Sequence, residues 1–280
     1  MEIAVGGVAD RSASSISKPS PEARLQSLFS EILIQQGRPG YASAEAHESE
    51  QPLDEQVQTA WSSWFGVETG GRYAQDADPA TLKREYGDLL TRALEEEGYY
   101  DPESFLQTLS GEELEVVQMI HRLADPIDLA QLDEEGMLNL LLPPPAQIDL
   151  NFDGLTRVGL GFMIRFPDSR TPPAVVEAWN EATAELSPRE KMTFQLQMKL
   201  PTLLANFVLN EDGSFSHARQ PGDPDFVNPM ASPDYSYLDL TGRQLESLEL
   251  FKYQMQPERY ESQTAFWTSF QQALADHGAS

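Results

Sequence analysis

Apolar residues recur at every third or fourth position along most of this chain, and that spacing is typical of one face of an α-helix. The first such stripe follows Ser20 and Pro21 and ends at Gly37, where a left-handed residue commonly closes a helix. The pattern therefore predicts a mainly α-helical protein. The stripes place helices over residues 21–37, 57–66, 79–98, 110–123, 133–141, 171–186, 187–200, 238–251 and 257–278.

Several of these helices begin at residues that can cap the free backbone N–H groups of a first turn. Ser110 with Glu113, and Ser187 with Glu190, have the spacing of a capping box, in which each side chain accepts a hydrogen bond from the other residue's backbone. Pro is favoured directly after a capping Asp, because a first-turn N–H has no partner inside the helix. Three Asp-Pro pairs therefore predict helix starts, at residues 78–79, 101–102 and 125–126.

Residues 192–200 fit both a strand and a helix. Alternate residues from Met192 to Leu200 are apolar, as in a strand, but Met192, Leu196 and Leu200 also lie four residues apart, as on one helix face. Met, Gln, Lys and Leu favour helices, and the capping box at Ser187 precedes the segment. We therefore predict a helix here.

A short alternation of apolar and polar residues follows three prolines near the middle of the chain. In it, the oxygen-bearing residues Asp149, Asn151 and Asp153 precede a Gly, which resembles the first half of an EF-hand calcium loop. The resemblance covers six residues and stops there, because the twelfth position, which needs a Glu, is Leu160. One interpretation is therefore a divalent-cation site, with calcium as the ion, at Asp149, Asn151 and Asp153.

The other interpretation of this segment is a β-hairpin with a two-residue turn at 153–154, flanked by Phe152 and Leu155. In that hairpin, both turn residues adopt positive φ, and Asp149 and Asn151 share the solvent-exposed face. We prefer the hairpin, because the calcium pattern lacks its closing ligand.

The three consecutive prolines, residues 143–145, cannot continue a helix and divide the chain. We predict an acidic helical subdomain over residues 23–145, and a subdomain with the hairpin and further helices over residues 146–280. Residues 1–22 are rich in Ser, Gly and Ala, offer little to bury, and predict a disordered leader. Such Ser-rich leaders also occur on substrates of flagellar-type export machines, so non-classical export is an alternative to an ordinary frayed terminus.

The chain is strongly acidic, with 45 Asp and Glu against 19 Lys and Arg and a formal net charge of −26. Residues 76–150 alone carry eighteen acidic and four basic side chains, which is more than half of that charge. Such a surface repels polyphosphates, so we expect neither nucleic acid nor an anionic membrane as a partner. We expect the Glu runs, including residues 134–135, to lie on solvated faces or at helix ends.

The sequence contains no recognisable catalytic motif. The absence of Cys excludes disulfides, thiolate metal sites and a Cys nucleophile. His121 has Asp125 four residues later, as in a His–carboxylate pair, but an exposed pair on a helix surface is the simpler interpretation. Nucleophile elbows, zinc-binding His-Glu-x-x-His and Gly-rich phosphate loops are all missing. We therefore predict no catalytic residues, and the sequence favours a non-enzyme while leaving that question open.

Together these patterns predict a mainly α protein, an irregular helical bundle with one or two short β-hairpins. We expect an acidic interaction or accessory protein that binds a basic or polar protein partner, with calcium binding through Asp149, Asn151 and Asp153 as the alternative. No other cofactor is expected. The first residues lack the basic segment and long apolar run of a secretory signal, so we expect a cytoplasmic protein. The sequence does not address oligomeric state.

Overall fold

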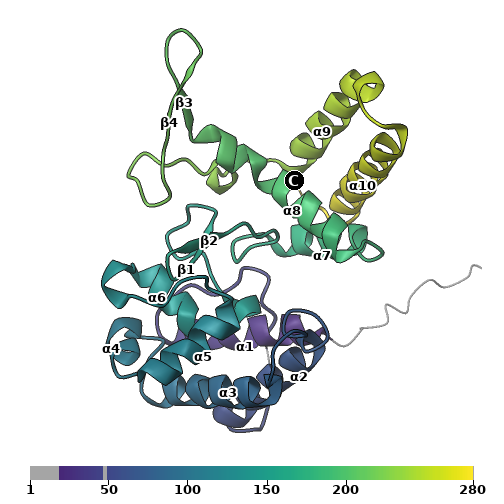
Figure 1. The fold of residues 1–280 in the computed structure, drawn as a ribbon. Coiled ribbons are helices and arrows are strands. Elements are labelled where there is room, and N and C mark those ends of the chain that lie inside the picture. Colours follow the sequence, from purple (N-terminus) through teal and green to yellow (C-terminus); the bar gives the residue numbers. More distant parts are fainter. Residues whose placement is uncertain (1–18, 47–48, 280) are drawn as a thin grey trace, which may run out of the picture.

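The computed structural model describes residues 19–46 and 49–279 (Figure 1). These residues form a mainly helical protein with two short antiparallel hairpins, which confirms the predicted fold class. The predicted leader over residues 1–22 falls largely outside the described residues. The helices are α1 (Pro21–Gln35), α2 (Leu53–Glu68), α3 (Pro79–Glu95), α4 (Pro102–Gln107), α5 (Gly111–His121), α6 (Glu134–Leu141), α7 (Pro173–Ala182), α8 (Pro188–Ala205), α9 (Tyr237–Phe251) and α10 (Pro257–Asp276). The strands are β1 (Thr156–Val158), β2 (Gly161–Met163), β3 (Phe207–Leu209) and β4 (Phe215–Ala218).

The buried apolar side chains divide into two clusters, and we call the parts of the chain around them the first lobe and the second lobe. The cluster of the first lobe draws on α1–α6 and extends to Val158 in β1, and the cluster of the second lobe begins at Phe166 and draws on α7–α10. Figure 1 shows two groups of helices with β1–β2 between them. The subdomain boundary at residues 145–146 stays a prediction of the sequence.

Aromatic residues of α2 and α3 fill the centre of the first lobe. Trp61 is fully buried, and its ring centroid lies 5.1 Å from those of Phe65 and Tyr86. Its indole N–H donates to the backbone oxygen of Lys83 at 2.8 Å, and the Tyr86 hydroxyl donates to that of Leu142 at 3.0 Å. Each large ring therefore buries its apolar body and still satisfies its polar atom.

Aromatic stacking also organises the second lobe. Phe194 of α8 stacks on Phe266 of α10 with ring centroids 3.6 Å apart, and Trp179 of α7 meets Phe266 and Phe270 edge to face at 5.7 Å. Both α7 and α9 pack against α10, so the last helix is the centre of this lobe.

Most predicted helix starts are confirmed, because a cap depends on residues that are close in sequence. The predicted helix over residues 192–200 is also confirmed as part of α8, which even continues through Pro201. The capping side chains that accept the expected backbone N–H bonds are Ser20, Asp78, Asp101, Ser110, Asp133 and Ser187.

The third Asp-Pro pair does not start a helix, so that prediction is wrong. Asp125 and Pro126 are exposed in the connection after α5, which turns away at Arg122 with φ 57°. The next helical turn is a short 3-10 turn (Leu129–Gln131), and Asp128 caps it instead. A local capping signal fails here because the residues after it make no continuous apolar stripe.

The hairpin near residue 150 lies further along the chain than predicted. β1 and β2 pair with Val158 opposite Gly161, so Gly159 and Leu160 form the turn. The predicted two-residue turn at 153–154 is therefore wrong.

An irregular loop over residues 149–155 precedes the hairpin. Gly154 has the expected positive φ of 85°, but Phe152 has the other positive φ of 67°, which we predicted for Asp153. The Asp153 side chain accepts the N–H of Leu155 at 2.8 Å, so this Asp closes a side-chain turn and does not join two strands.

The proline segment is buried and held by polar contacts. The backbone oxygen of Pro145 accepts hydrogen bonds from the Tyr41 hydroxyl at 2.8 Å and from Gln26 Nε2 at 3.0 Å. The Arg165 guanidinium donates to the same oxygen at 3.2 Å and to that of Pro144 at 2.5 Å. Prolines have no backbone N–H to donate, but the carbonyls of this segment accept hydrogen bonds from α1, from the loop after α1 and from the chain beyond β2. The proline segment therefore connects these three parts of the chain.

Gly136 lets the backbone of α6 touch the turn of the first hairpin. Its backbone oxygen accepts the N–H of Gly159 at 3.1 Å, and a Cβ added at Gly136 would lie 2.4 Å from the Gly159 oxygen. We expect Gly136→Ala to lower the free energy of unfolding by roughly 1–3 kcal/mol, because the added methyl group meets a backbone atom and the chain must shift to make room. Gly66→Ala in α2, where an added Cβ meets open space, should raise it by up to about 1 kcal/mol. Chemical denaturation measures both, and an unchanged Gly136→Ala protein would contradict the close contact.

Candidate functional site

The acidic side chains of residues 76–150 lie mostly on the surface of the first lobe. Twelve of the eighteen are exposed and two, Glu135 and Asp149, are buried. Little positive charge is left to offset them, because three of the four basic residues in this stretch are paired within the molecule. These pairs are Arg84–Glu85, Arg92–Glu113 and Arg122–Asp76.

A groove of about 660 Å³ lies between α2 and α3 on this acidic surface. The one basic residue in its lining is Arg92, whose guanidinium pairs with Glu113 of α5 at 2.6 Å. Both helices contribute carboxylates to the lining, namely Asp54, Glu55, Asp88 and Glu95. The groove is therefore a concave site of negative charge.

The two helices that form this groove are fixed to each other. Gln58 Nε2 in α2 donates to the Thr91 hydroxyl at 2.8 Å and to the backbone oxygen of Gly87 at 2.7 Å, both in α3. A Cβ at Gly87 would lie 3.0 Å from Gln58 Oε1 and 3.1 Å from Trp61, so the glycine permits the close approach. The carboxylates thus stand on a preformed scaffold, which lowers the ordering cost of binding.

Sequence reasoning located the acidic stretch but missed this groove. Asp54 and Glu55 lie outside residues 76–150, and acidic residues in the first turn of a helix are usually explained by the helix dipole. The only available signal was that two acid-bearing helices follow each other directly, and sequence does not give the rotation of each helix about its axis.

The predicted cation ligands lie together in the loop over residues 149–155, but their oxygens hold backbone groups. Asp149 Oδ2 accepts the N–H of Gly154 at 2.8 Å, and Asn151 Oδ1 accepts the N–H of Asp153 at 2.9 Å. Asp153 Oδ1 accepts the N–H of Leu155 at 2.8 Å, while Asn151 Nδ2 donates to Asp153 Oδ2 at 3.2 Å. The three side chains therefore stabilise the conformation of the loop through hydrogen bonds to its own backbone.

Asp149 is buried at 1 % exposure, so it does not share the predicted solvent-exposed face with Asn151. Its Oδ1 atom has no hydrogen-bond partner among the described residues. Burial raises the pKa of Asp149 to about 6, although the Gly154 N–H opposes that rise. Calcium binding at this loop stays a prediction.

Glu135 lies in the first turn of α6, at a helix end as one of our two predicted alternatives has it, but its side chain is buried against the same loop and does not face solvent. Its Oε2 accepts the N–H groups of Leu150 at 3.1 Å and Asn151 at 3.3 Å, and its Oε1 accepts that of Arg157 at 2.8 Å. Burial raises the pKa of Glu135 to about 8, against the opposing effect of these donors. Its neighbour Glu134 does face solvent, so one of these two consecutive Glu residues is exposed and the other is buried.

A buried ion pair joins this loop to the second lobe. Lys199 of α8 is fully buried, and its ammonium pairs with Asp168 and donates to the backbone oxygen of Gly154 at 2.9 Å. Asp168 Oδ1 also accepts the Thr171 hydroxyl and the Arg170 N–H, both at 2.9 Å. Burial alone would raise the pKa of Asp168, but Lys199 and these donors outweigh it and hold that pKa below its usual value. Sequence reasoning missed the pair, because its members lie 31 residues apart.

His121 is buried, so the exposed pair predicted with Asp125 is wrong. Its Nε2 lies 2.9 Å from the backbone oxygen of Leu140, and its Nδ1 lies 2.9 Å from Gln147 Nε2. This geometry places the ring proton on Nε2, which donates to Leu140, while Nδ1 accepts from Gln147. Burial lowers the pKa of His121 to about 3, so the ring is neutral and serves the packing of the first lobe.

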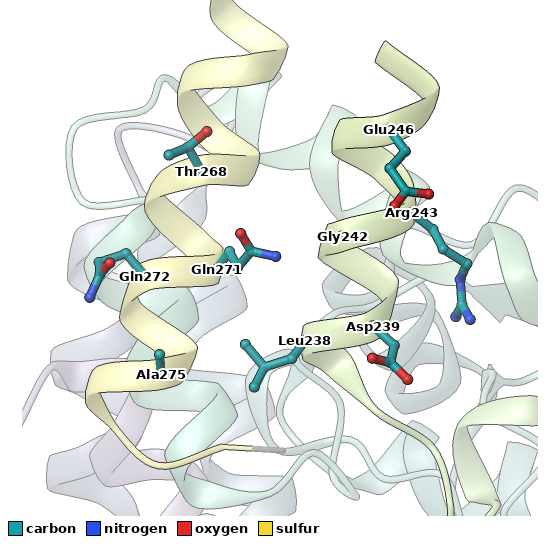
Figure 2. Close-up of a pocket in the computed structure, with 9 residues that line it drawn as sticks. All are labelled: Leu238, Asp239, Gly242, Arg243, Glu246, Thr268, Gln271, Gln272 and Ala275. Atoms are coloured by element: carbon teal, nitrogen blue, oxygen red, sulfur yellow. The ribbon is translucent and has the colours of Figure 1, made fainter. Parts of the chain in front are cut away.

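A second groove, of about 670 Å³, lies between α9 and α10 (Figure 2). Figure 2 shows Leu238 and Gln271 directed toward the space between the helices, whereas Arg243 and Asp239 point to the far side of α9. Its charged side chains do not converge. We therefore take the α2–α3 groove as the candidate functional site.

Within residues 19–46 and 49–279, the His, Asp and Glu side chains do not gather in groups of three or more that could hold a metal ion. Among the helices of this described part, none combines the length and apolar character needed to cross a membrane. Comparison with protein-family models, curated proteins and solved structures gives no match for this chain. Its function is therefore inferred from the surfaces and contacts described above.

Proposed function

We propose that this chain is a non-enzymatic interaction protein that binds a basic protein segment in the acidic groove between α2 and α3. The observation that carries this proposal is the lining of the groove. Carboxylates from two fixed helices face one concave site, and its one basic side chain, Arg92, is already engaged by Glu113.

The charge around the groove supports this kind of partner. Residues 95–97, all Glu and all exposed, extend the negative surface from the groove beyond the end of α3. A surface of one sign attracts an oppositely charged partner over about a Debye length, roughly 8 Å at 0.15 M salt, and speeds its association. Binding should therefore be fast and sensitive to salt.

The size of the groove sets what can enter it. A volume of about 660 Å³ is in the range of small-ligand sites, so it suits a few side chains and not a folded domain. Arg fits best, because its planar guanidinium can donate to two carboxylates at once. We therefore expect a short Arg-containing segment of the partner to occupy the groove.

Binding of a fluorescently labelled Arg-rich peptide, followed by anisotropy at several salt concentrations, tests the proposal. The test variant is Asp54→Asn, Glu55→Gln, Asp88→Asn and Glu95→Gln. It should bind about tenfold more weakly or worse, which corresponds to roughly 1.4 kcal/mol, and show a flatter salt dependence.

A matched control separates the groove from net charge. The control removes four exposed acidic charges of the second lobe, by Gln substitution at Glu185, Glu246, Glu258 and Glu261. It should bind the peptide nearly as the unmodified protein does. Equal weakening of peptide binding in both variants would mean that net charge, and not the groove, determines the affinity. Absence of peptide binding by the unmodified protein at low salt would refute the proposal.

A further inference from the structure

The β3–β4 hairpin projects from the end of α8, away from the helices of both lobes (Figure 1). Leu209 lies opposite Phe215, and the rings of Phe207 and Phe215 meet edge to face at 5.9 Å, so the three side chains share one face. Their exposures are 52 % for Phe207, 59 % for Leu209 and 61 % for Phe215. We call these three residues the arm face.

Polar contacts fix the base of this hairpin. The Arg219 N–H donates to the backbone oxygen of Asn206 at 2.9 Å, and its guanidinium donates to that of Ala205 at 3.1 Å. The Asn206 side chain in turn accepts from and donates to the backbone of Val227, both at 2.8 Å. The arm face is therefore presented in one orientation at the end of α8.

Three exposed apolar side chains lie on α8, the helix that ends directly before the hairpin. Met192, Leu196 and Leu204 are 63 %, 43 % and 56 % exposed. Together with the arm face they form what we call the apolar strip. An isolated two-stranded hairpin is marginal in water and has unpaired strand edges, so covering the strip would stabilise it.

Charge and area indicate what covers the strip. Apart from the buried Lys199, residues 188–219 carry three basic and three acidic side chains, whereas the whole chain carries −26. Two copies that repel each other through their first lobes can therefore meet at this nearly neutral segment. Six large side chains, each about half exposed, offer roughly 600 Å² per copy, and about 1,200 Å² for a pair lies at the lower end of stable interfaces.

We propose that two copies of this chain associate through the apolar strip, with their arm faces packed together about a twofold axis. Such an interface is self-complementary, because each copy supplies the same patch. This association is independent of the acidic groove.

Sedimentation velocity of the full chain over a range of concentrations tests the proposal. The expected result is a monomer–dimer equilibrium that shifts toward dimer when salt rises from about 0.05 M to about 0.5 M, because salt screens the −26 charges. Binding of a basic peptide should weaken over the same range, so the two proposals can fail separately. A protein that stays monomeric up to several hundred micromolar at high salt would overturn the dimer.

Charge substitutions at Leu209 make the test specific. Leu209→Glu and Leu209→Lys should each be monomeric, because each places like charges at the interface, and an equimolar mixture of the two should recover dimer. Leu250→Glu on α9, at a site that is 73 % exposed, is the matched control and should dimerise normally. Dimers that persist in both single Leu209 variants, or an equal loss in the control, would contradict the assignment, and circular dichroism verifies that each variant is folded.

Discussion

Lys199→Met is expected to lower the free energy of unfolding by about 3–5 kcal/mol, because it leaves the buried carboxylate of Asp168 without its counter-ion. The Gly154 carbonyl also loses its donor, so the hydrogen bond between α8 and the loop over residues 149–155 is lost. Urea denaturation measures the loss.

A second substitution shows whether the unpaired charge is the cause. Lys199→Met combined with Asp168→Asn removes both charges, and this double variant should be more stable than Lys199→Met alone. Lys252→Met is the control, since Lys252 pairs with Glu249 at the surface and its loss should leave stability unchanged within error. A Lys199→Met protein as stable as the unmodified one would mean that the pair contributes nothing to the junction of the lobes.

Ionisation of Glu135 is expected to lower the free energy of unfolding by about 1.4 kcal/mol between pH 7 and pH 9. The reason is that the pKa of Glu135 is about 8 in the folded protein and 4.5 in the unfolded chain. A raised pKa means that the folded state binds the proton more tightly. The resulting stability is complete below about pH 4.5 and is lost as the pH rises through 8.

The buried groups Asp149 and His121 titrate at lower pH. Asp149 has a pKa of about 6, so its contribution to the free energy of unfolding is lost as the pH rises through 6, mainly below pH 7. His121, with a pKa lowered to about 3, has the opposite sign and destabilises the fold as the pH falls below 6.5. The interval from pH 7 to pH 9 therefore excludes Asp149 and His121. Glu181 and Glu177 raise the pKa of His277 above its usual 6.5, so this residue adds a loss of the same sign as Glu135.

Substitution distinguishes Glu135 from the general acidity of the chain. Glu135→Gln cannot ionise at this position, so its free energy of unfolding should fall much less from pH 7 to pH 9 than that of the unmodified protein. Its overall stability is lower, because the amide replaces one acceptor oxygen. Glu134→Gln, at the exposed neighbouring position, should keep the slope of the unmodified protein. An undiminished slope in Glu135→Gln would assign the pH effect to another group.

The features that the sequence predicted correctly are those set by neighbouring residues. Ser110 and Glu113 form a capping box because residues three positions apart come close at the start of any helix, and Ser187 with Glu190 does the same. The apolar stripes likewise report burial, because helical periodicity alone places their residues on one face.

The features that the sequence missed depend on contacts between distant segments. Lys199, Glu135 and His121 resemble ordinary surface positions, and each is buried by a partner from another element. The turn at Asp153 was misplaced for the same reason: Asp-Gly is a strong local signal, but burial of Asp149 commits the loop to a different path. The α2–α3 groove escaped because it depends on how two helices are rotated against each other.

The buried proline segment also has a consequence for the order of folding. Tyr41 reaches the carbonyl of Pro145 across 104 residues, and Arg165 reaches the Tyr41 hydroxyl at 3.0 Å across 124 residues. Contacts between such distant residues form slowly, because the intervening chain must lose its freedom first. During synthesis on a ribosome, Tyr41 therefore lacks these two partners until residue 165 has emerged. We expect the first lobe to reach its final form only when more than half of the chain has been made.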